Sequence, residues 1–145
     1  MRIIIDADAC PVKKEIVCVA KELELAVTMV MDTSHTYEDG YSKVIIVDKA
    51  RDSADFTIVN LIVKGDIIIT QDYGVATMVL AKGCYAMNQD GLIYDKDNID
   101  QLLFQRHLSA KVRRAGGKTT GPKKRDKESN INFKENFKAF CTKYI

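Results

Sequence analysis

The fold is decided by residues 2–23, which read RIIIDADACPVKKEIVCVAKEL. Three isoleucines in succession, with no polar alternation, are typical of a short strand that is covered on both faces. Pro11 suits the first position of a helix, because proline there gives up no hydrogen bond. Apolar residues then recur at helical spacing, at Val12, Ile16, Val19, Ala20 and Leu23. A strand that leads directly into a helix is the repeating unit of an α/β sheet.

The same alternation continues along the chain. We expect strands over residues 2–5, 26–31, 43–47, 67–70 and 84–87. We expect further helices from Asp52 or Ser53 to Lys64, over 73–82, over 99–114 with Asn98 as the cap, and over 131–144. Asp90-Gly91 indicates a tight turn of a hairpin. The sequence therefore predicts one α/β domain over 1–145, a Rossmann-like three-layer sandwich whose mainly parallel central sheet is flanked by helices.

Charge divides this chain into two parts. The net charge is +2, but residues 1–105 carry ten Lys and Arg against seventeen Asp and Glu, a net charge of −7. Residues 106–145 carry twelve Lys and Arg against three Asp and Glu, a net charge of +9. A basic segment over 106–127 can bind a phosphate backbone, or it can be a solvated loop that promotes solubility. The candidate nucleic-acid-binding residues are Arg106, Lys111, Arg113, Arg114, Lys118, Lys123, Lys124 and Arg125.

Three acidic motifs fall at predicted strand ends or helix starts. Asp6 and Asp8 flank one small residue, so both can project to the same side of the chain. Asp52 and Asp55 are one helical turn apart, and Asp72 follows the strand that ends at Thr70. Each carboxylate taken alone is also a good helix cap, and that interpretation stays open. The carboxyl ends of parallel strands are where ligand sites lie, so we expect the motifs to meet.

Repulsion among such carboxylates is relieved by a hard divalent cation. We therefore expect Mg²⁺ or Mn²⁺ as cofactor, with Thr70 orienting a ligand. The predicted metal ligands are Asp6, Asp8, Asp52, Asp55 and Asp72, and the predicted catalytic residues are Asp6, Asp8, Asp55 and Asp72. His35 and His107 are isolated in the sequence and are expected to be surface histidines. Cys10 could be a nucleophile before Pro11, but a packed thiol is the better interpretation.

The chain resembles the YaiI/YqxD family of bacterial proteins. The resemblance is carried by DADACPVK at 6–13, DSAD at 52–55, Gly65-Asp66, TQD at 70–72, RHL at 106–108 and the turn at 113–117. Through its acidic pattern it also resembles the PIN-like nuclease superfamily, which implies an Mg²⁺- or Mn²⁺-dependent phosphodiesterase. Under that resemblance Asp6 matches the acid of the first strand and Asp55 a later acid, followed by Thr70 and Asp72. Many PIN domains also carry an acid on an intervening helix, where this chain has Glu38 and Asp39 in a loop-like stretch.

Three functions fit these features. The leading hypothesis is metal-dependent cleavage of nucleic acid, RNA more than DNA. The alternatives are an RNA-binding protein without catalytic activity and, further behind, a haloacid-dehalogenase-like phosphatase with Asp6 as nucleophile. Such a phosphatase also needs paired acids after a later strand, where this chain has only Asn88-Gln89-Asp90. We expect a cytoplasmic protein without a membrane partner, since the cysteines form no CxxC pair and no apolar run approaches about 20 residues. A homo-oligomer is left open.

Overall fold

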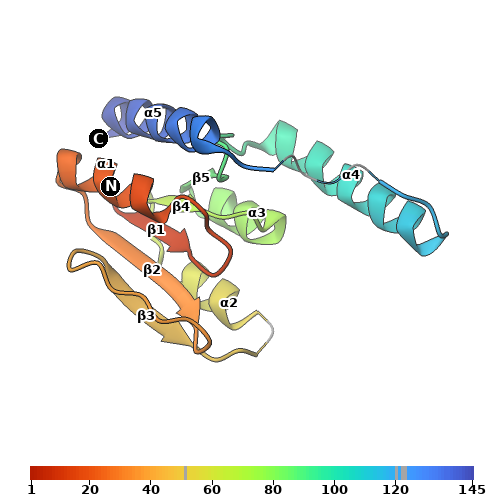
Figure 1. Ribbon diagram of the computed structural model, residues 1–145, viewed down its shortest axis with the longest axis horizontal. Coiled ribbons are helices and arrows are strands. Elements are labelled where there is room, and N and C mark those ends of the chain that lie inside the picture. Colours follow the sequence, from red (N-terminus) through yellow and green to blue (C-terminus); the bar gives the residue numbers. More distant parts are fainter. Residues whose placement is uncertain (51, 120, 122–123) are drawn as a thin grey trace.

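The computed structural model describes residues 1–50, 52–119, 121 and 124–145. Five parallel strands form one sheet in the order β3-β2-β1-β4-β5 (Figure 1). The strands are β1 (Ile3–Asp6), β2 (Val27–Asp32), β3 (Lys43–Val47), β4 (Ile67–Ile69) and β5 (Tyr85–Met87). The predicted α/β class and parallel sheet are therefore confirmed, with strand bounds within one residue of expectation.

Helices cover both faces of the sheet. They are α1 (Lys13–Leu23), α2 (Ser53–Leu61), α3 (Tyr73–Ala81), α4 (Lys96–Arg114) and α5 (Lys127–Tyr144). Side chains alternate along β1, so Ile3 and Ile5 pack with α1 and α5, while Ile4 packs with α2 and α3. The two cores make a three-layer sandwich, as predicted. Asp6 shares the alternation of Ile4 and therefore ends β1 on the α2 and α3 side.

Several helix ends differ from the sequence prediction because side chains cap them. Helix α2 ends at Leu61 rather than Lys64, since the next turn brings the Val63 N–H to the buried carboxylate of Asp66 at 2.9 Å. The predicted cap of α4 is wrong: Asp95 is the cap, and Asn98 completes a capping box with it. The expected hairpin is reduced to a single antiparallel bridge between Met87 and Ile93.

Two helices in the basic half of the chain complete the fold in different ways. Helix α5 begins at Lys127, four residues before the expected start, because Asp126 and Ser129 form a second capping box. Its Phe133 and Phe137 are fully buried against α1 and the sheet. Helix α4 instead projects away from the sheet, and the chain returns beside it to α5 (Figure 1). None of the described helices combines the length and the apolar character needed to span a bilayer.

Candidate functional site

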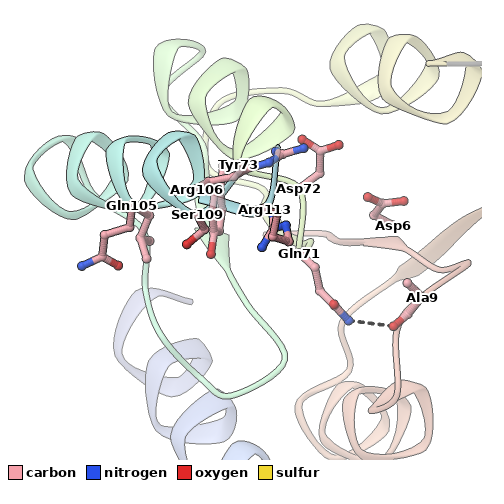
Figure 2. Close-up of a pocket in the computed structure, with 10 residues that line it drawn as sticks. Asp6, Ala9, Gln71, Asp72, Tyr73, Gln105, Arg106, Ser109 and Arg113 are labelled. Atoms are coloured by element: carbon pink, nitrogen blue, oxygen red, sulfur yellow. Dashed lines mark hydrogen bonds between the residues drawn. The ribbon is translucent and has the colours of Figure 1, made fainter. Parts of the chain in front are cut away.

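The site lies where the strand order changes direction. The chain passes from β1 to β2 and β3 on one side of β1, and then returns to β4 and β5 on the other. Ligand sites of open parallel sheets lie at such a point, outside the carboxyl ends of the strands. The loops after β1 and β4 meet here, and the Gln71 side chain donates a hydrogen bond to the Ala9 carbonyl oxygen at 2.7 Å (Figure 2). These two strand ends carry Asp6, Asp8, Thr70 and Asp72.

Thr70 links two of the predicted carboxylates. Its side chain is buried, and its hydroxyl donates a hydrogen bond to Asp6 Oδ2 at 2.9 Å. The same hydroxyl accepts a hydrogen bond from the Asp72 N–H at 3.0 Å. Burial raises the pKa of Asp6, the Thr70 hydrogen bond opposes this shift, and the charges of Asp72 and Asp8 add to it. One hydroxyl therefore fixes the relative positions of Asp6 and the Asp72 backbone.

Asp72 is the N-cap of α3. Its Oδ1 accepts hydrogen bonds from Gly74 N at 2.8 Å and Val75 N at 3.2 Å. The interpretation of Asp72 as a helix cap is therefore confirmed. Both cap bonds involve Oδ1, which leaves Oδ2 outside the cap. A residue can thus cap a helix with one oxygen and line a cavity at the same time.

The start of α2 brings Asp52 and Asp55 to the same edge. Asp52 has the left-handed backbone conformation, with φ of +67°, and its side chain makes no capping hydrogen bond. Capping therefore does not account for Asp52, and a non-glycine residue in this conformation costs roughly 1–2 kcal/mol. Asp55 lies in the first turn of the helix. The strained backbone turns the chain so that both residues line one cavity.

We call this cavity, of about 310 Å³, the acidic cavity. The carboxylates that line it are Asp6, Asp8, Asp32, Asp48, Asp52, Asp55 and Asp72. Burial, the largest cause, and the negative charges of Asp72, Asp6 and Asp52 together raise the pKa of Asp55 to about 6. The structure therefore brings all five predicted metal ligands to one cavity, where their charges repel one another. A hard divalent cation relieves repulsion of this kind.

Three side chains at one side of the acidic cavity lie closer together. His35 Nδ1 is 3.0 Å from Asp8 Oδ1 and 3.2 Å from Asp32 Oδ1. In the part of the chain that the structure describes, this is the one set of three or more potential metal ligands whose ligand atoms lie within 4.8 Å of one another. His35 is exposed, as expected of a surface histidine, but it lies beside the carboxylates of Asp8 and Asp32. Asp6, Asp52, Asp55 and Asp72 line the cavity in a wider arrangement.

Sequence reasoning missed Asp32, Asp48 and His35. Asp32 ends β2 as Asp6 ends β1, and Asp48 directly follows β3, so a search for carboxylates after every parallel strand would have found both. Asp32 also meets Asp8 through its backbone, since its N–H lies 3.0 and 3.2 Å from the two Asp8 oxygens. No periodicity points to His35, because a turn after β2 brings it back to the strand end.

A second cavity, of about 620 Å³, adjoins the first, and we call it the α4 cavity. Asp6 and Asp72 line both cavities. The α4 side chains Arg106, Ser109 and Arg113 face the ends of β1 and β4 across it (Figure 2). Gln71, Tyr73, Leu102 and Gln105 complete its main lining. Two arginines of the basic segment therefore lie beside the carboxylates. Sequence spacing alone could not place these arginines there.

The remaining predicted nucleic-acid-binding residues are distributed differently. Lys111, Arg114, Lys118 and Lys124 are exposed and are not among the residues that line either cavity. Arg125 forms an ion pair with Asp90 and donates hydrogen bonds to Asn130 Oδ1 at 3.1 and 3.0 Å, so it holds the returning chain to the body. The prediction for Lys123 falls outside the described residues.

Two other sequence candidates lie apart from the carboxylates of the site. Cys10 is buried in the core between β1 and α1, and burial raises the pKa of its thiol, which agrees with a packed thiol rather than a nucleophile. Asp39 accepts hydrogen bonds from the backbone N–H groups of Tyr41 at 2.8 Å and Ser42 at 2.6 Å. It therefore stabilises the loop before β3 and is not among the residues that line either cavity.

Comparison with known proteins identifies relatives along nearly the whole chain. Residues 4–143 match the family model described as "Uncharacterized BCR, YaiI/YqxD family". A UPF0178 protein of Ruminiclostridium cellulolyticum is 56% identical over 93% of this chain and 88% of its own. UPF0178 proteins of Clostridium tetani and Oceanobacillus iheyensis are 52% and 46% identical, covering 94% and 99% of this chain and 93% and 100% of theirs. No solved structure matches the chain.

Proposed function

The chain belongs to the YaiI/YqxD family, and we propose that it is a metal-dependent nuclease of the PIN-like superfamily that hydrolyses phosphodiester bonds. The proposal rests chiefly on one observation: Asp6 and Asp72 line both the acidic cavity and the α4 cavity with its two arginines. Carboxylates bind a divalent cation, and arginines bind phosphate oxygens. A phosphodiester held at the boundary between the cavities would contact both groups.

The donor set of the acidic cavity fits Mg²⁺ or Mn²⁺. The carboxylates supply hard oxygen ligands, and burial together with the negative charges of Asp72, Asp6 and Asp52 raises the pKa of Asp55. Asp6, Asp8, Asp52, Asp55 and Asp72 would hold the ion, with Asp32 as a further ligand. When bound, the cation would polarise the phosphodiester and offset the charge that develops during its hydrolysis. His35 lies beside Asp8 and Asp32 and would add an imidazole ligand, which is more typical of transition metals than of Mg²⁺.

The chain's own residues have separable roles in this proposal. Thr70 holds Asp6 in place through its hydroxyl, and the α3 cap holds Asp72. Arg106 and Arg113 lie seven residues apart on one face of α4, so they can contact successive phosphates of one strand. Because Tyr73 also lines the α4 cavity, its ring offers a face on which a base can stack.

RNA is the proposed substrate rather than DNA. Gln71, Gln105 and Ser109 line the α4 cavity with groups that both donate and accept hydrogen bonds. The 2′-hydroxyl of RNA is both a donor and an acceptor, and it is the group that distinguishes RNA from DNA at a protein site.

The phosphatase alternative loses support at the end of β5. Asn88 stands where a haloacid-dehalogenase-like site needs paired acids, and its side chain accepts hydrogen bonds from the N–H groups of Asp90 and Leu92, both at 2.9 Å. The residue therefore shapes the turn after the strand. The alternative of an RNA-binding protein without catalytic activity would use the same α4 cavity. Only experiment distinguishes this hypothesis from the nuclease.

The decisive experiment compares cleavage of one labelled RNA and the single-stranded DNA of the same sequence, with Mn²⁺, Mg²⁺ or EDTA. We expect cleavage of RNA with Mn²⁺, and its loss in the Asp6→Asn variant. Glu135→Gln, an exposed carboxylate of α5 outside both cavities, is the matched control and should keep wild-type activity.

Each other outcome has a definite meaning. Equal cleavage by wild type and Asp6→Asn would identify a contaminant and overturn the proposal. Binding that weakens steeply with salt, without cleavage under any divalent cation, would identify an RNA-binding protein. Turnover of p-nitrophenyl phosphate that Asp6→Asn abolishes would restore the phosphatase.

A further inference from the structure

The outer face of α4 carries an apolar stripe. Phe104, Leu108 and Val112 follow one another at four-residue spacing and are 62%, 43% and 44% exposed. Residues at this spacing lie on one side of a helix. Arg106 and Arg113, which line the α4 cavity, lie on the opposite side of the helix, and Gln105 and Ser109 lie between the two sides. The stripe therefore faces away from the two arginines of the α4 cavity.

In the described part of the chain, Gly117 packs against Val112 at the C-terminal end of the stripe, and Phe104 and Leu108 stay 62% and 43% exposed. Helix α4 packs against α3 through its first turns, where Ile99 is its one buried residue. The rest of the helix projects from the body (Figure 1). A single exposed apolar side chain needs no explanation, but a row of three over two turns of a projecting helix is typical of an interaction surface.

Charge along the stripe indicates what covers it. Asp97 and Asp100 lie beside it at the N-terminal end of α4, and Lys111 lies beside it at the C-terminal end. A second α4 packed antiparallel would place the acidic end of each helix against the basic end of the other. A parallel second copy would bring like charges together, and so is disfavoured.

We propose that two copies of this chain associate through the outer faces of their α4 helices, packed antiparallel about a two-fold axis at the level of residue 106. In that register Phe104 of each copy packs against Leu108 of the other. Asp100 of each copy then lies within reach of Lys111 of the other. The contact is self-complementary, as a two-fold interface requires. It leaves both α4 cavities open on the outer sides of the helix pair.

The size of the interface sets the expected affinity. Helix α4 has 19 residues, so the contact is at most about 28 Å long. One pair of helices of this length buries an area at the low end of specific interfaces, below roughly 1,200 Å² in total. We therefore expect a reversible dimer with a dissociation constant in the micromolar range, in exchange with the 16.3 kDa monomer.

Sedimentation velocity of the full chain, from low micromolar to several hundred micromolar, tests the proposal. We expect a concentration-dependent dimer, and Leu108→Glu should weaken it by about tenfold or more, since it places a charge in the apolar seam. Phe56→Glu is the matched control, because Phe56 of α2 is 65% exposed and lies outside the stripe. Circular dichroism and thermal melting confirm that each variant is folded.

A charge exchange tests the antiparallel register independently of apolar area. Asp100→Lys alone should weaken the dimer, and Asp100→Lys combined with Lys111→Asp should restore it, because the exchanged pair is again complementary in both symmetric contacts. A monomer at every concentration would overturn the proposal. So would a dimer that Leu108→Glu leaves intact, or a double variant that dimerises no better than Asp100→Lys.

Discussion

The Thr70 hydroxyl lies 2.9 Å from Asp6 Oδ2, and it joins the ends of two neighbouring strands that are 64 residues apart in sequence. Thr70 is 2% exposed, so this hydrogen bond is shielded from water. The carboxylate at the centre of the candidate site is therefore held by a buried side chain rather than by a charged partner.

Replacing Thr70 with Val keeps the shape of the side chain and removes both hydrogen bonds of its hydroxyl. The Asp72 N–H and Asp6 Oδ2 then lose their partner, which we expect to cost about 1–3 kcal/mol of unfolding free energy. Urea denaturation measures this loss. Thr70→Ser keeps the hydroxyl and should recover most of it. Equal stability of the Val and Ser variants would show that the hydroxyl contributes little.

Replacing Asp72 separates its two roles. Asp72→Ser keeps a good N-cap, so α3 should stay within about 0.5 kcal/mol of wild-type stability, whereas Asp72→Ala should lose about 1 kcal/mol. Both variants remove the carboxylate and should lose Mn²⁺-dependent cleavage. Thermal melting and cleavage rates measured on the same samples distinguish the roles. A fully active Ser variant would remove Asp72 from the candidate catalytic set.

Asp55 should make the metal-free protein less stable as pH rises. Its pKa is raised to about 6 in the fold, so the folded state holds this proton more tightly than the unfolded chain, whose Asp pKa is about 3.9. The stabilisation from the bound proton is present at low pH and is lost as pH rises through about 6. Asp55→Asn should therefore melt higher than wild type at neutral pH.

The expected difference in stability between wild type and Asp55→Asn is small, and it should depend on pH and on Mn²⁺. Solvent screens partly exposed carboxylates, so we expect about 1 kcal/mol, equivalent to about 3 °C. Near pH 4 wild-type Asp55 is itself neutral, and the two proteins should melt together. Saturating Mn²⁺ should reverse the order at neutral pH, because only the wild type supplies this ligand. A difference that stayed constant with pH would contradict the assignment.

Arg106 and Arg113 should contribute to nucleic-acid binding more than exposed basic residues elsewhere. Arg106→Gln and Arg113→Gln should each weaken binding of a labelled single-stranded RNA and make its dependence on salt shallower by about one contact. Lys143→Gln removes one charge from α5, outside both cavities, and is the control. If all three variants lost affinity equally, binding would depend on net charge rather than on the α4 cavity.

Much of the fold could be predicted because local rules and packing agree. Isoleucine runs specify buried parallel strands, as at Ile67–Ile69 in β4, and their order along the chain specifies a sheet with helices on both faces. The predictions failed where a side chain several residues away decides a boundary. Asp66 binds the turn after α2, and Asp95 rather than Asn98 caps α4.

The candidate site, like the fold, could be predicted from the sequence only in part. Carboxylates after parallel strands must meet at one edge of the sheet, so the sequence was sufficient to predict that Asp6, Asp8 and Asp72 lie close together. It was not sufficient to place His35, whose position depends on a loop conformation. It also could not show that Arg113 lines the α4 cavity while Lys111 does not. Two basic residues on one helix differ in role only through the face that packing turns inward.

The ion pair between Arg125 and Asp90 has a consequence for how this protein can diversify. It ties the chain that comes back from α4 to the turn that precedes α4, so the projecting segment leaves and rejoins the body at neighbouring points. An excursion closed in this way can lengthen, shorten or change its charge without displacing a strand, since loop closure depends only weakly on length. The carboxylates and the segment that faces them can therefore evolve at different rates, so that the lining of the α4 cavity changes while the acidic cavity stays as it is.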